Sequence, residues 1–356
     1  MKSVLYRPRH VVIRSRRLGS RQLAVGVALL FALLVSVVAL GSQSRSNSAV
    51  AAPVSRDGVS RTIPAREPPP RVAAPPSAPE PSAQAAPPAA VAPPAAPPAA
   101  PLVEPGAELT IGDFFVHIPP AFSERMRVIV ALHGMGGRGS DFCQMLLARA
   151  DREGWVVVAP TFAYGDWRDP NQVTTEESSR FIPRLHEFLQ QLPEQTGLPL
   201  EPRAALFGFS RGAQLAQRFA MIYPEQTLGV AALSAGTYTL PASATQVNGQ
   251  RVTLRYPFGV ADLKERFGRE FNLDALRGIP FWIAVGGDDR NPTDLPRQWD
   301  PYLGNTRVSR AEAFAQWLRD TGVQVQLVVL PGVDHAIADE ERARALDFFA
   351  TLDPAR

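Results

Sequence analysis

The sequence of 356 residues contains a single cysteine, Cys143. One cysteine excludes a disulfide within the chain and any metal cluster built on several cysteines. Histidine is also scarce, and no two of the five side chains have the spacing of zinc ligands; they are His10, His117, His133, His186 and His335. We therefore expect no metal site.

Acidic residues are absent from the first 50 positions, which carry eight Lys and Arg side chains. The whole chain has a formal net charge of +3, and removing these eight charges leaves −5 for residues 51–356. The basic character therefore belongs to the N-terminus, and the rest is mildly acidic. This distribution argues against nucleic acid as a partner, because a nucleic-acid-binding domain needs a basic surface.

One long uncharged apolar run lies at residues 23–40, and only Gly26 and Ser36 interrupt it. As a helix it would span about 27 Å, close to the ~30 Å hydrocarbon core of a bilayer. Since seven of the eight basic residues precede the run and only Arg45 follows it, the positive-inside rule places the N-terminus in the cytoplasm. We predict a basic cytoplasmic tail at 1–21 and a transmembrane signal anchor at 22–41, with the remainder outside the membrane. The alternative is a signal peptide cleaved after residues 49–51, Ala-Val-Ala, which would give a secreted protein.

Proline is concentrated in one segment, since 16 of the 35 prolines lie at residues 51–104. Pro-Pro-Ala-Ala repeats cannot bury enough apolar surface to fold, and they favour extended polyproline II conformation. We predict a disordered linker at 42–104 that acts as a spacer. A folded domain is expected at 105–356.

Short apolar runs recur in this domain at residues 127–132, 155–159, 204–207, 230–233, 281–285 and 325–330. Such runs are typical of buried strands in a parallel sheet. Helices are predicted at 140–153, 176–191, 211–223 and 311–320, the second with a kink at Pro183. The alternation indicates an α/β fold, a mainly parallel sheet with helices on both faces. Residues 107–118 are expected to add antiparallel edge strands, and residues 236–279 form an insertion of no predicted fold.

A Gly-x-Ser-x-Gly pattern at residues 208–212 follows one predicted strand and opens a helix. A nucleophilic serine on such a sharp turn needs glycine two residues to either side, because side chains there would clash with the strand and the helix. The alternative is an ordinary turn in which the serine caps the helix. We predict that Ser210 is a nucleophile.

A serine hydroxyl needs a neighbouring base to become a strong nucleophile. His335 lies in the loop after the last predicted strand, at the sheet edge where sites form in such folds. Two carboxylates, Asp288 and Asp289, follow the strand at 281–285, and either could orient the imidazole. The spacing from Gly286 favours Asp289, so we predict a triad of Ser210, His335 and Asp289.

An oxyanion hole requires two backbone N–H donors. We assign one to Arg211, after the nucleophile, and the other to Met135 in the loop His-Gly-Met-Gly-Gly at 133–137. Aromatic side chains after the strand at 155–159 are predicted to bind substrate: Phe162, Tyr164 and Trp167.

The insertion supplies two further aromatic candidates, Tyr256 and Phe258, which we expect to cover the same edge as a partial lid. For all five aromatics the alternative is that they pack loops against the domain. Trp299 and Tyr302 are interpreted as structural.

The loop at His133 and Gly134, the turn at 208–212, Asp289 and His335 stand in the order of the α/β-hydrolase superfamily. Residues 107–352 resemble its esterase group, which includes dienelactone hydrolases, carboxylesterases and polyhydroxybutyrate-depolymerase-like proteins. The resemblance implies hydrolysis of a small-molecule carboxylic ester through an acyl-enzyme, without a cofactor. We expect a monomer. The oxyanion loop departs from the His-Gly-Gly-Gly of some lipases. No separate polymer-binding domain is predicted, which argues against action on solid polyester.

Two other functions remain open at this point. One is an envelope acyltransferase or serine peptidase, which would use the same chemistry. The other is a non-catalytic, membrane-tethered hydrolase-like protein.

Overall fold

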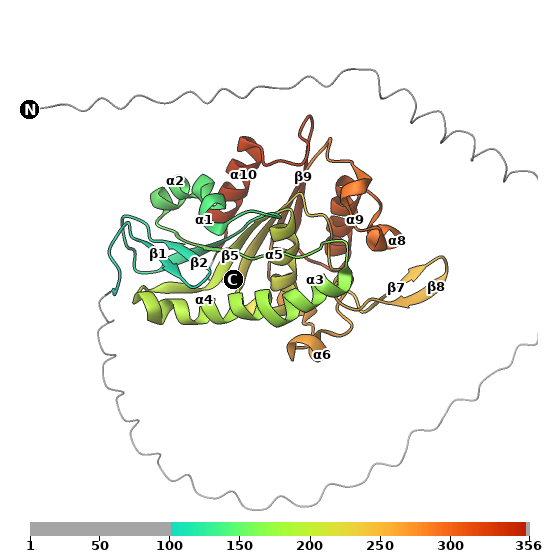
Figure 1. Ribbon diagram of the computed structural model, residues 1–356, viewed down its shortest axis with the longest axis horizontal. Coiled ribbons are helices and arrows are strands. Elements are labelled where there is room, and N and C mark those ends of the chain that lie inside the picture. The colour runs from blue at the N-terminus through green and yellow to red at the C-terminus, as the bar shows by residue number, and fades with distance from the viewer. Residues whose placement is uncertain (1–100, 354–356) are drawn as a thin grey trace, which may run out of the picture. The chain divides into compact units, whose positions relative to one another are not determined.

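A central sheet of eight strands organises residues 101–353, the part of the chain that the computed structural model describes (Figure 1). The strands are β1 (Glu108–Ile111), β2 (Phe114–His117), β3 (Met126–Leu132), β4 (Val156–Pro160), β5 (Leu200–Phe209), β6 (Thr227–Leu233), β9 (Phe281–Gly286) and β10 (Val325–Leu330). Their spatial order is β1-β2-β4-β3-β5-β6-β9-β10. Only the pairings of β2 with β1 and β4 are antiparallel. The predicted strands, the mainly parallel sheet and the antiparallel edge at 107–118 are therefore confirmed.

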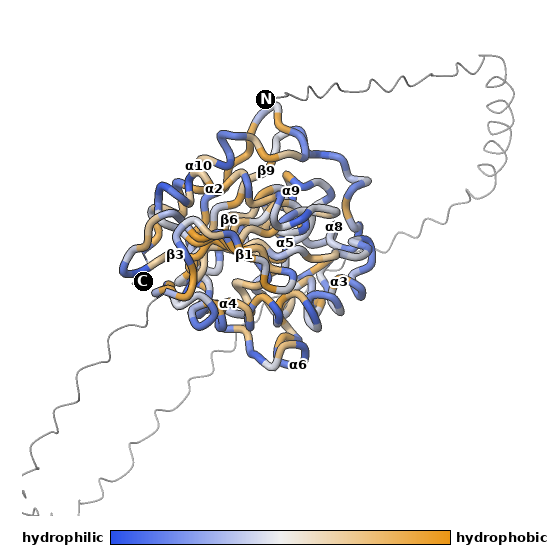
Figure 2. The backbone as a smooth tube through the Cα atoms, turned by 60° about the vertical axis from the view of Figure 1, so that its left-hand side comes forward, coloured by the Kyte–Doolittle hydropathy of each residue, from blue (hydrophilic) through white to orange (hydrophobic). Residues whose placement is uncertain are grey.

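Helices cover both faces of the sheet, as predicted. One face packs against α4 (Ile182–Thr196), α5 (Arg211–Ile222) and α9 (Arg307–Asp320), and the other against α1 (Gly139–Phe142), α2 (Gln144–Glu153) and α10 (Asp339–Ala350). A hydrophobic core lies on each face of the sheet, and alternate residues of β3 belong to the two cores. Val128 and Val130 face the first core, whereas Ile129 and Ala131 face the second. The hydrophobic segments accordingly gather at the centre in Figure 2, and hydrophilic ones lie outside.

Two helix predictions need correction, and one helix was not predicted. The helix expected at 140–153 is divided at Cys143 into α1 and α2. The helix expected at 176–191 is longer, running from α3 (Pro170–Glu176) through a π-helical turn (Glu177–Phe181) into α4. Pro183 lies in the first turn of α4, directly after the π turn, whose wider ring accommodates the missing N–H. Helix α10 was not predicted, because its sequence mixes charged and apolar residues without a clear apolar face.

The insertion at 236–279 contains a hairpin of β7 (Ala244–Val247) and β8 (Gln250–Thr253), followed by α6 (Leu263–Phe267) and α7 (Leu273–Arg277). The hairpin forms a sheet of its own and projects from the domain (Figure 1). Short helical segments complete the fold: Pro224–Gln226, Pro292–Asp294, Arg297–Trp299 and α8 (Asp300–Leu303).

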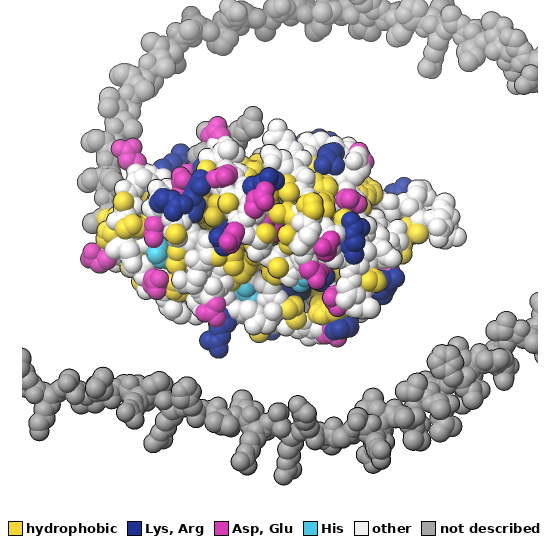
Figure 3. Space-filling view, turned by 90° about the horizontal axis from the view of Figure 1, so that it is seen from above, with side chains coloured by type: hydrophobic (Ala, Val, Ile, Leu, Met, Phe, Trp, Pro, Cys, Tyr) yellow, Lys and Arg dark blue, Asp and Glu magenta, His cyan; other side chains and the backbone are white. Residues whose placement is uncertain are grey.

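The predicted tail at 1–21, the anchor at 22–41 and the linker up to residue 100 lie outside the described residues. Leu102 is tied to the domain, because its N–H donates to the carbonyl of Thr196 over 2.9 Å. Among the helices of residues 101–353, none combines the length and hydropathy of a membrane-spanning segment. On the face drawn in Figure 3, basic and acidic side chains are interspersed.

Candidate active site

Ser210 occupies the turn between β5 and α5 in a strained backbone conformation, with φ 53° and ψ −112°. Flanking glycines make this turn possible. A Cβ atom on Gly208 would lie 2.5 Å from the carbonyl oxygen of Gly212, and one on Gly212 would lie 2.0 Å from that of Leu132. Both clashes are with backbone, which cannot move aside, so the turn requires glycine at both positions and holds the serine at the edge of the sheet.

Three side chains predicted from separate loops meet at this turn. His335 Nε2 lies 3.0 Å from Ser210 Oγ, and His335 Nδ1 lies 2.7 Å from Asp289 Oδ2. Asp289 is 1 % exposed, whereas the neighbouring Asp288 side chain is exposed and makes no hydrogen bond to the imidazole. The structure therefore brings together Ser210, His335 and Asp289, and Asp288 takes no part in this hydrogen-bonded series.

Backbone contacts fix the histidine loop against the aspartate turn. Gly287 N–H donates to the carbonyl of Leu330 over 2.7 Å, and Asp288 N–H donates to that of Val333 over 2.9 Å. A side chain on Gly286 would collide with the carbonyl of Val333 at 2.3 Å, so glycine permits this approach. The ring of Phe209 stacks on His335 with centroids 4.9 Å apart, which fixes the plane of the imidazole.

The second oxygen of Asp289 is held by a cation that the sequence did not single out. Arg307 Nη1 donates to Asp289 Oδ1 over 2.8 Å. Burial alone would raise the pKa of Asp289, but the hydrogen bond from His335 and the charge of Arg307 outweigh it and keep the pKa below its usual value. The carboxylate is therefore ionised at neutral pH and able to orient the imidazole.

The loop after β3 presents Met135 beside Ser210, and Met135 is 44 % exposed. The loop is fixed by His133: its Nδ1 lies 2.6 Å from the carbonyl of Gly134, and its Nε2 accepts a hydrogen bond from Phe162 N–H over 3.0 Å. Burial lowers the pKa of His133, which keeps the ring neutral as these two bonds require. Arg211 is the first residue of α5, where a backbone N–H has no acceptor within the helix.

A hollow of about 310 Å³ opens beside Ser210 and His335. Its other lining residues are Met135, Trp167, Arg168, Val173, Arg211, Gln214, Gly236, Thr237, Asp294, Pro296, Trp299 and Arg307. Trp167, one of the aromatic side chains that we expect to bind substrate, lines the hollow. Trp299, interpreted as structural, lines it too, although its indole N–H is anchored on the carbonyl of Tyr238.

The other aromatic side chains singled out in the sequence lie outside the lining of this hollow. Phe162 is buried and Tyr164 packs against the core; their rings contact Phe181, and neither lines the hollow. Tyr256 is buried with its hydroxyl on Glu177, and Phe258 packs on Trp299. From the insertion, only Gly236 and Thr237 line the hollow, so the insertion does not cover the site with aromatic rings.

Residues 129–348 match the family described as "Alpha/beta hydrolase family". The chain belongs to the alpha/beta hydrolase family. A sequence search of curated proteins found no match. Among solved structures, the chain is similar to poly(aspartic acid) hydrolase-1 from Sphingomonas sp. KT-1, with 19% identity and a TM-score of 0.52 over 70% of this chain and 98% of that one. It is also similar to LpqC, a poly(3-hydroxybutyrate) depolymerase from Bordetella parapertussis, with 22% identity and a TM-score of 0.50 over 67% and 86%.

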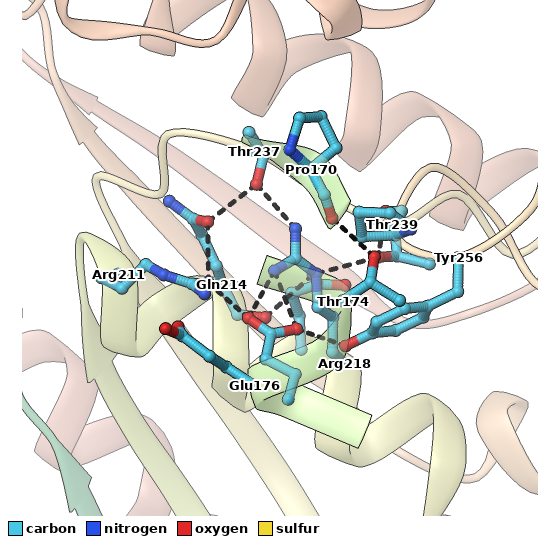
Figure 4. A network of polar contacts seen from close by, with 12 residues as sticks. Pro170, Thr174, Glu176, Arg211, Gln214, Arg218, Thr237, Thr239 and Tyr256 are labelled. Atoms are coloured by element: carbon cyan, nitrogen blue, oxygen red, sulfur yellow. Dashed lines mark hydrogen bonds and ion pairs between the residues drawn. The ribbon is translucent and has the colours of Figure 1, made fainter. Parts of the chain in front are cut away.

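This alpha/beta hydrolase buries a charged network around Arg211 and Arg218, two side chains of α5 (Figure 4). Glu177, in the π-helical turn, pairs with Arg211 and with Arg218 of α5 and accepts a hydrogen bond from the Tyr256 hydroxyl. Burial alone would raise the pKa of Glu177, but the two guanidinium groups hold it below its usual value. The network ties α3–α4, the serine helix and the insertion together, and it leaves two cations for one anion.

Sequence reasoning missed Arg307, Glu177 and Gln214 in this hydrolase. The structure marks the region of Glu177 with a π turn, and such turns often accompany functional sites. The sequence does not show this turn, so it offered no signal for these residues. No three His, Cys, Asp or Glu side chains among residues 101–353 gather as a metal site would require.

Proposed function

We propose that this alpha/beta hydrolase is a serine esterase that cleaves carboxylic esters through an acyl-enzyme. One observation carries the proposal: Ser210 Oγ lies within hydrogen-bonding distance of an imidazole whose far nitrogen rests on a buried carboxylate. A base, its orienting group and a serine on a strained turn are the parts that acyl transfer needs.

In the first half-reaction, Ser210 Oγ attacks the carbonyl carbon of the ester, and His335 Nε2 takes the hydroxyl proton. The negative charge on the carbonyl oxygen would be stabilised by the N–H groups of Met135 and Arg211. The carbon–oxygen bond to the alcohol then breaks, and the imidazolium returns its proton to the leaving alcohol. Asp289 stabilises the imidazolium while it exists.

In the second half-reaction, a water molecule gives its proton to His335 and attacks the acyl carbon. Collapse of the intermediate releases the carboxylic acid and restores the proton to Ser210. Because bonds and protons balance with water alone, the proposal requires no metal or redox cofactor.

The test combines labelling with kinetics on the full chain. A fluorophosphonate probe should label wild-type protein and fail to label Ser210→Ala. On p-nitrophenyl esters of increasing chain length, Ser210→Ala and His335→Ala should each lose on the order of 10⁴-fold or more, with the double variant little worse, because the two groups act as a unit. Ser179→Ala, an exposed serine on the π turn, is the control and should keep wild-type activity.

A protein that takes no label and hydrolyses no ester of the series would contradict the proposal. Losses that add up in the double variant would show that Ser210 and His335 do not cooperate. Transfer of the acyl group to an added alcohol in preference to water would identify a transferase instead.

We further propose that residues 22–41 anchor the protein in the cytoplasmic membrane, with the hydrolase domain outside. The support is the uncharged run at 23–40 and the eight basic residues around it, seven of which precede the run.

A further inference from the structure

We infer that the hollow beside Ser210 selects esters whose acyl group ends in a second, negatively charged carboxylate. The inference rests on the proposed esterase function and adds the substrate class. Its basis is the polar lining of the hollow, in particular Arg307, Gln214 and the bare side of Gly236.

The charged residues around the hollow favour an anion. Three arginines line it, Arg168, Arg211 and Arg307, against one acid, Asp294. The Asp294 carboxylate is already engaged, because it accepts a hydrogen bond from the Asn291 amide over 3.1 Å. A carboxylate entering the hollow would therefore meet more positive than negative charge.

The ion pairs behind the hollow do not cancel this charge. Arg211 shares its partner Glu177 with Arg218, so two guanidinium groups face one carboxylate. Arg307 is paired with Asp289. Together these buried groups carry one uncompensated positive charge next to Ser210, and burying such a charge is unfavourable unless an anion accompanies it.

Arg307 retains unused donor capacity toward the site. Its side chain is 8 % exposed, with Nη1 on Asp289 and Nη2 3.4 Å from the carbonyl of Asp294. Its Nε is buried and has no hydrogen-bond partner among residues 101–353. A buried N–H without an acceptor costs free energy, and a substrate oxygen would remove that cost.

Gln214 is oriented so that its amide nitrogen is also available. Its Oε1 accepts hydrogen bonds from Arg211 Nη1 and from the Thr237 hydroxyl, which in turn accepts from Arg218 Nη2 (Figure 4). Because arginine can only donate, the oxygen of Gln214 must face Arg211, and the NH₂ group is left on the other side. That NH₂ group donates no hydrogen bond to any other residue of the described domain.

The two free donors flank Gly236. A Cβ atom added there would lie 3.1 Å from Gln214 Nε2 and 4.0 Å from Arg307 Nε. A side chain at this position would therefore lie against both donors, and Gly236 itself lines the hollow. A volume of about 310 Å³ is at the lower end for ligand pockets, which favours a short acyl chain.

The experiment compares two ethyl esters that differ only at the end of the acyl chain, monoethyl glutarate and ethyl pentanoate. The first carries a carboxylate where the second carries a methyl group. With the full-length wild-type protein, we expect kcat/KM for the half-ester to exceed that for the neutral ester by about 10-fold or more, the effect of one charge-assisted hydrogen bond. Acid release in a pH-stat gives both values.

Variants test the residues. Arg307→Met also disturbs Asp289 and will lower both rates, so the readout is the ratio of the two kcat/KM values, which should fall toward one. Gly236→Ala puts a methyl group between the donors and should lower the ratio without removing a charge. The control is Arg319→Met, the loss of an exposed arginine from the same helix α9, which should leave the ratio unchanged.

A wild-type ratio of one or less would overturn the inference, as would a high ratio that survives both Arg307→Met and Gly236→Ala. In either case hydrolysis that depends on Ser210 would leave the esterase proposal standing. Absence of hydrolysis of both esters, together with absence of fluorophosphonate labelling, would instead refute the esterase proposal itself.

Discussion

Adjacent aspartates in the turn after β9 have opposite surroundings. Asp289 is buried between His335 and Arg307, and both its oxygens accept hydrogen bonds. Asp288 is one residue away in sequence, yet its side chain is exposed and only its backbone contributes, through the bond to Val333. A pair so close in sequence and so different in environment allows a matched comparison.

We expect Asp289→Asn to reduce kcat/KM by about 10⁴-fold, because an amide cannot hold the imidazole in the tautomer that accepts the serine proton. Asp288→Asn should remain within a few-fold of wild type. Steady-state hydrolysis of one p-nitrophenyl ester by both variants is sufficient. If Asp288→Asn lost its activity while Asp289→Asn kept it, the assignment of Asp289 as the triad acid would be wrong.

The backbone of Met135 offers a second test at the level of one residue. Met135→Pro deletes the N–H that we assign to the oxyanion hole, whereas Met135→Ala keeps it and removes only an exposed side chain. Loss of one such donor costs about 10²–10³-fold in kcat. We therefore expect that loss for the proline variant and near-normal kcat for the alanine variant. Equal kcat values in the two variants would exclude Met135 N–H as a donor.

Among the helices, α10 carries a buried acid in its first turn. Glu341 is fully buried; its Oε2 accepts the N–H of Ala338 over 3.3 Å, and its Oε1 has no partner within residues 101–353. Burial, with a smaller contribution from the negative charge of Asp289, raises the pKa of Glu341 to about 7 despite the bond from Ala338. In the folded protein this carboxyl is therefore neutral below about pH 7.

The raised pKa makes folding stability depend on pH in a defined direction. An unfolded glutamate ionises near pH ~4.3, so the stabilising contribution of the neutral group is complete below that pH and is lost as pH rises to about 7. Relative to Glu341→Gln, we expect the wild-type free energy of unfolding to fall by on the order of 2–3 kcal/mol between pH 5 and pH 8. Urea unfolding of both proteins at a series of pH values measures this difference in the free energy of unfolding. The exposed neighbour in Glu340→Gln should show no such trend, and parallel curves for Glu341→Gln and wild type would contradict the assignment.

At the scale of the whole molecule, the proposed membrane anchor belongs to a segment distinct from the hydrolase domain. The full chain with a C-terminal tag should remain in the membrane fraction after an alkaline carbonate wash. Leu33→Arg places a charge near the middle of the apolar run, which costs about 2.5–3.5 kcal/mol for insertion, and should shift protein to the soluble fraction. Wild-type protein that is recovered soluble and shortened near residue 51 would support the signal-peptide alternative.

The sequence by itself determined the strands, their mainly parallel arrangement and the family resemblance. Strands buried on both faces appear in the sequence as continuous apolar runs, and the serine turn needs glycine at fixed positions. Both features are local and can therefore be recognised in the sequence. Ser210, His335 and Asp289 followed from the rule that loops after parallel strands meet at one edge of the sheet. The choice of Asp289 over Asp288 rested on the spacing from Gly286, and the hydrogen bond to His335 agrees with it.

Only the tertiary structure decided which side chains surround the serine. Phe162 and Tyr164 follow the right strand, but the turns of the loop decide where each side chain points, and these two pack against the core while Trp167 lines the hollow. Arg307 and Glu177 carry charged side chains, which are mostly exposed in folded proteins, so sequence analysis expects them on the surface. Their burial depends on partners up to 41 residues away, Asp289 and Arg218, so no local pattern could reveal it.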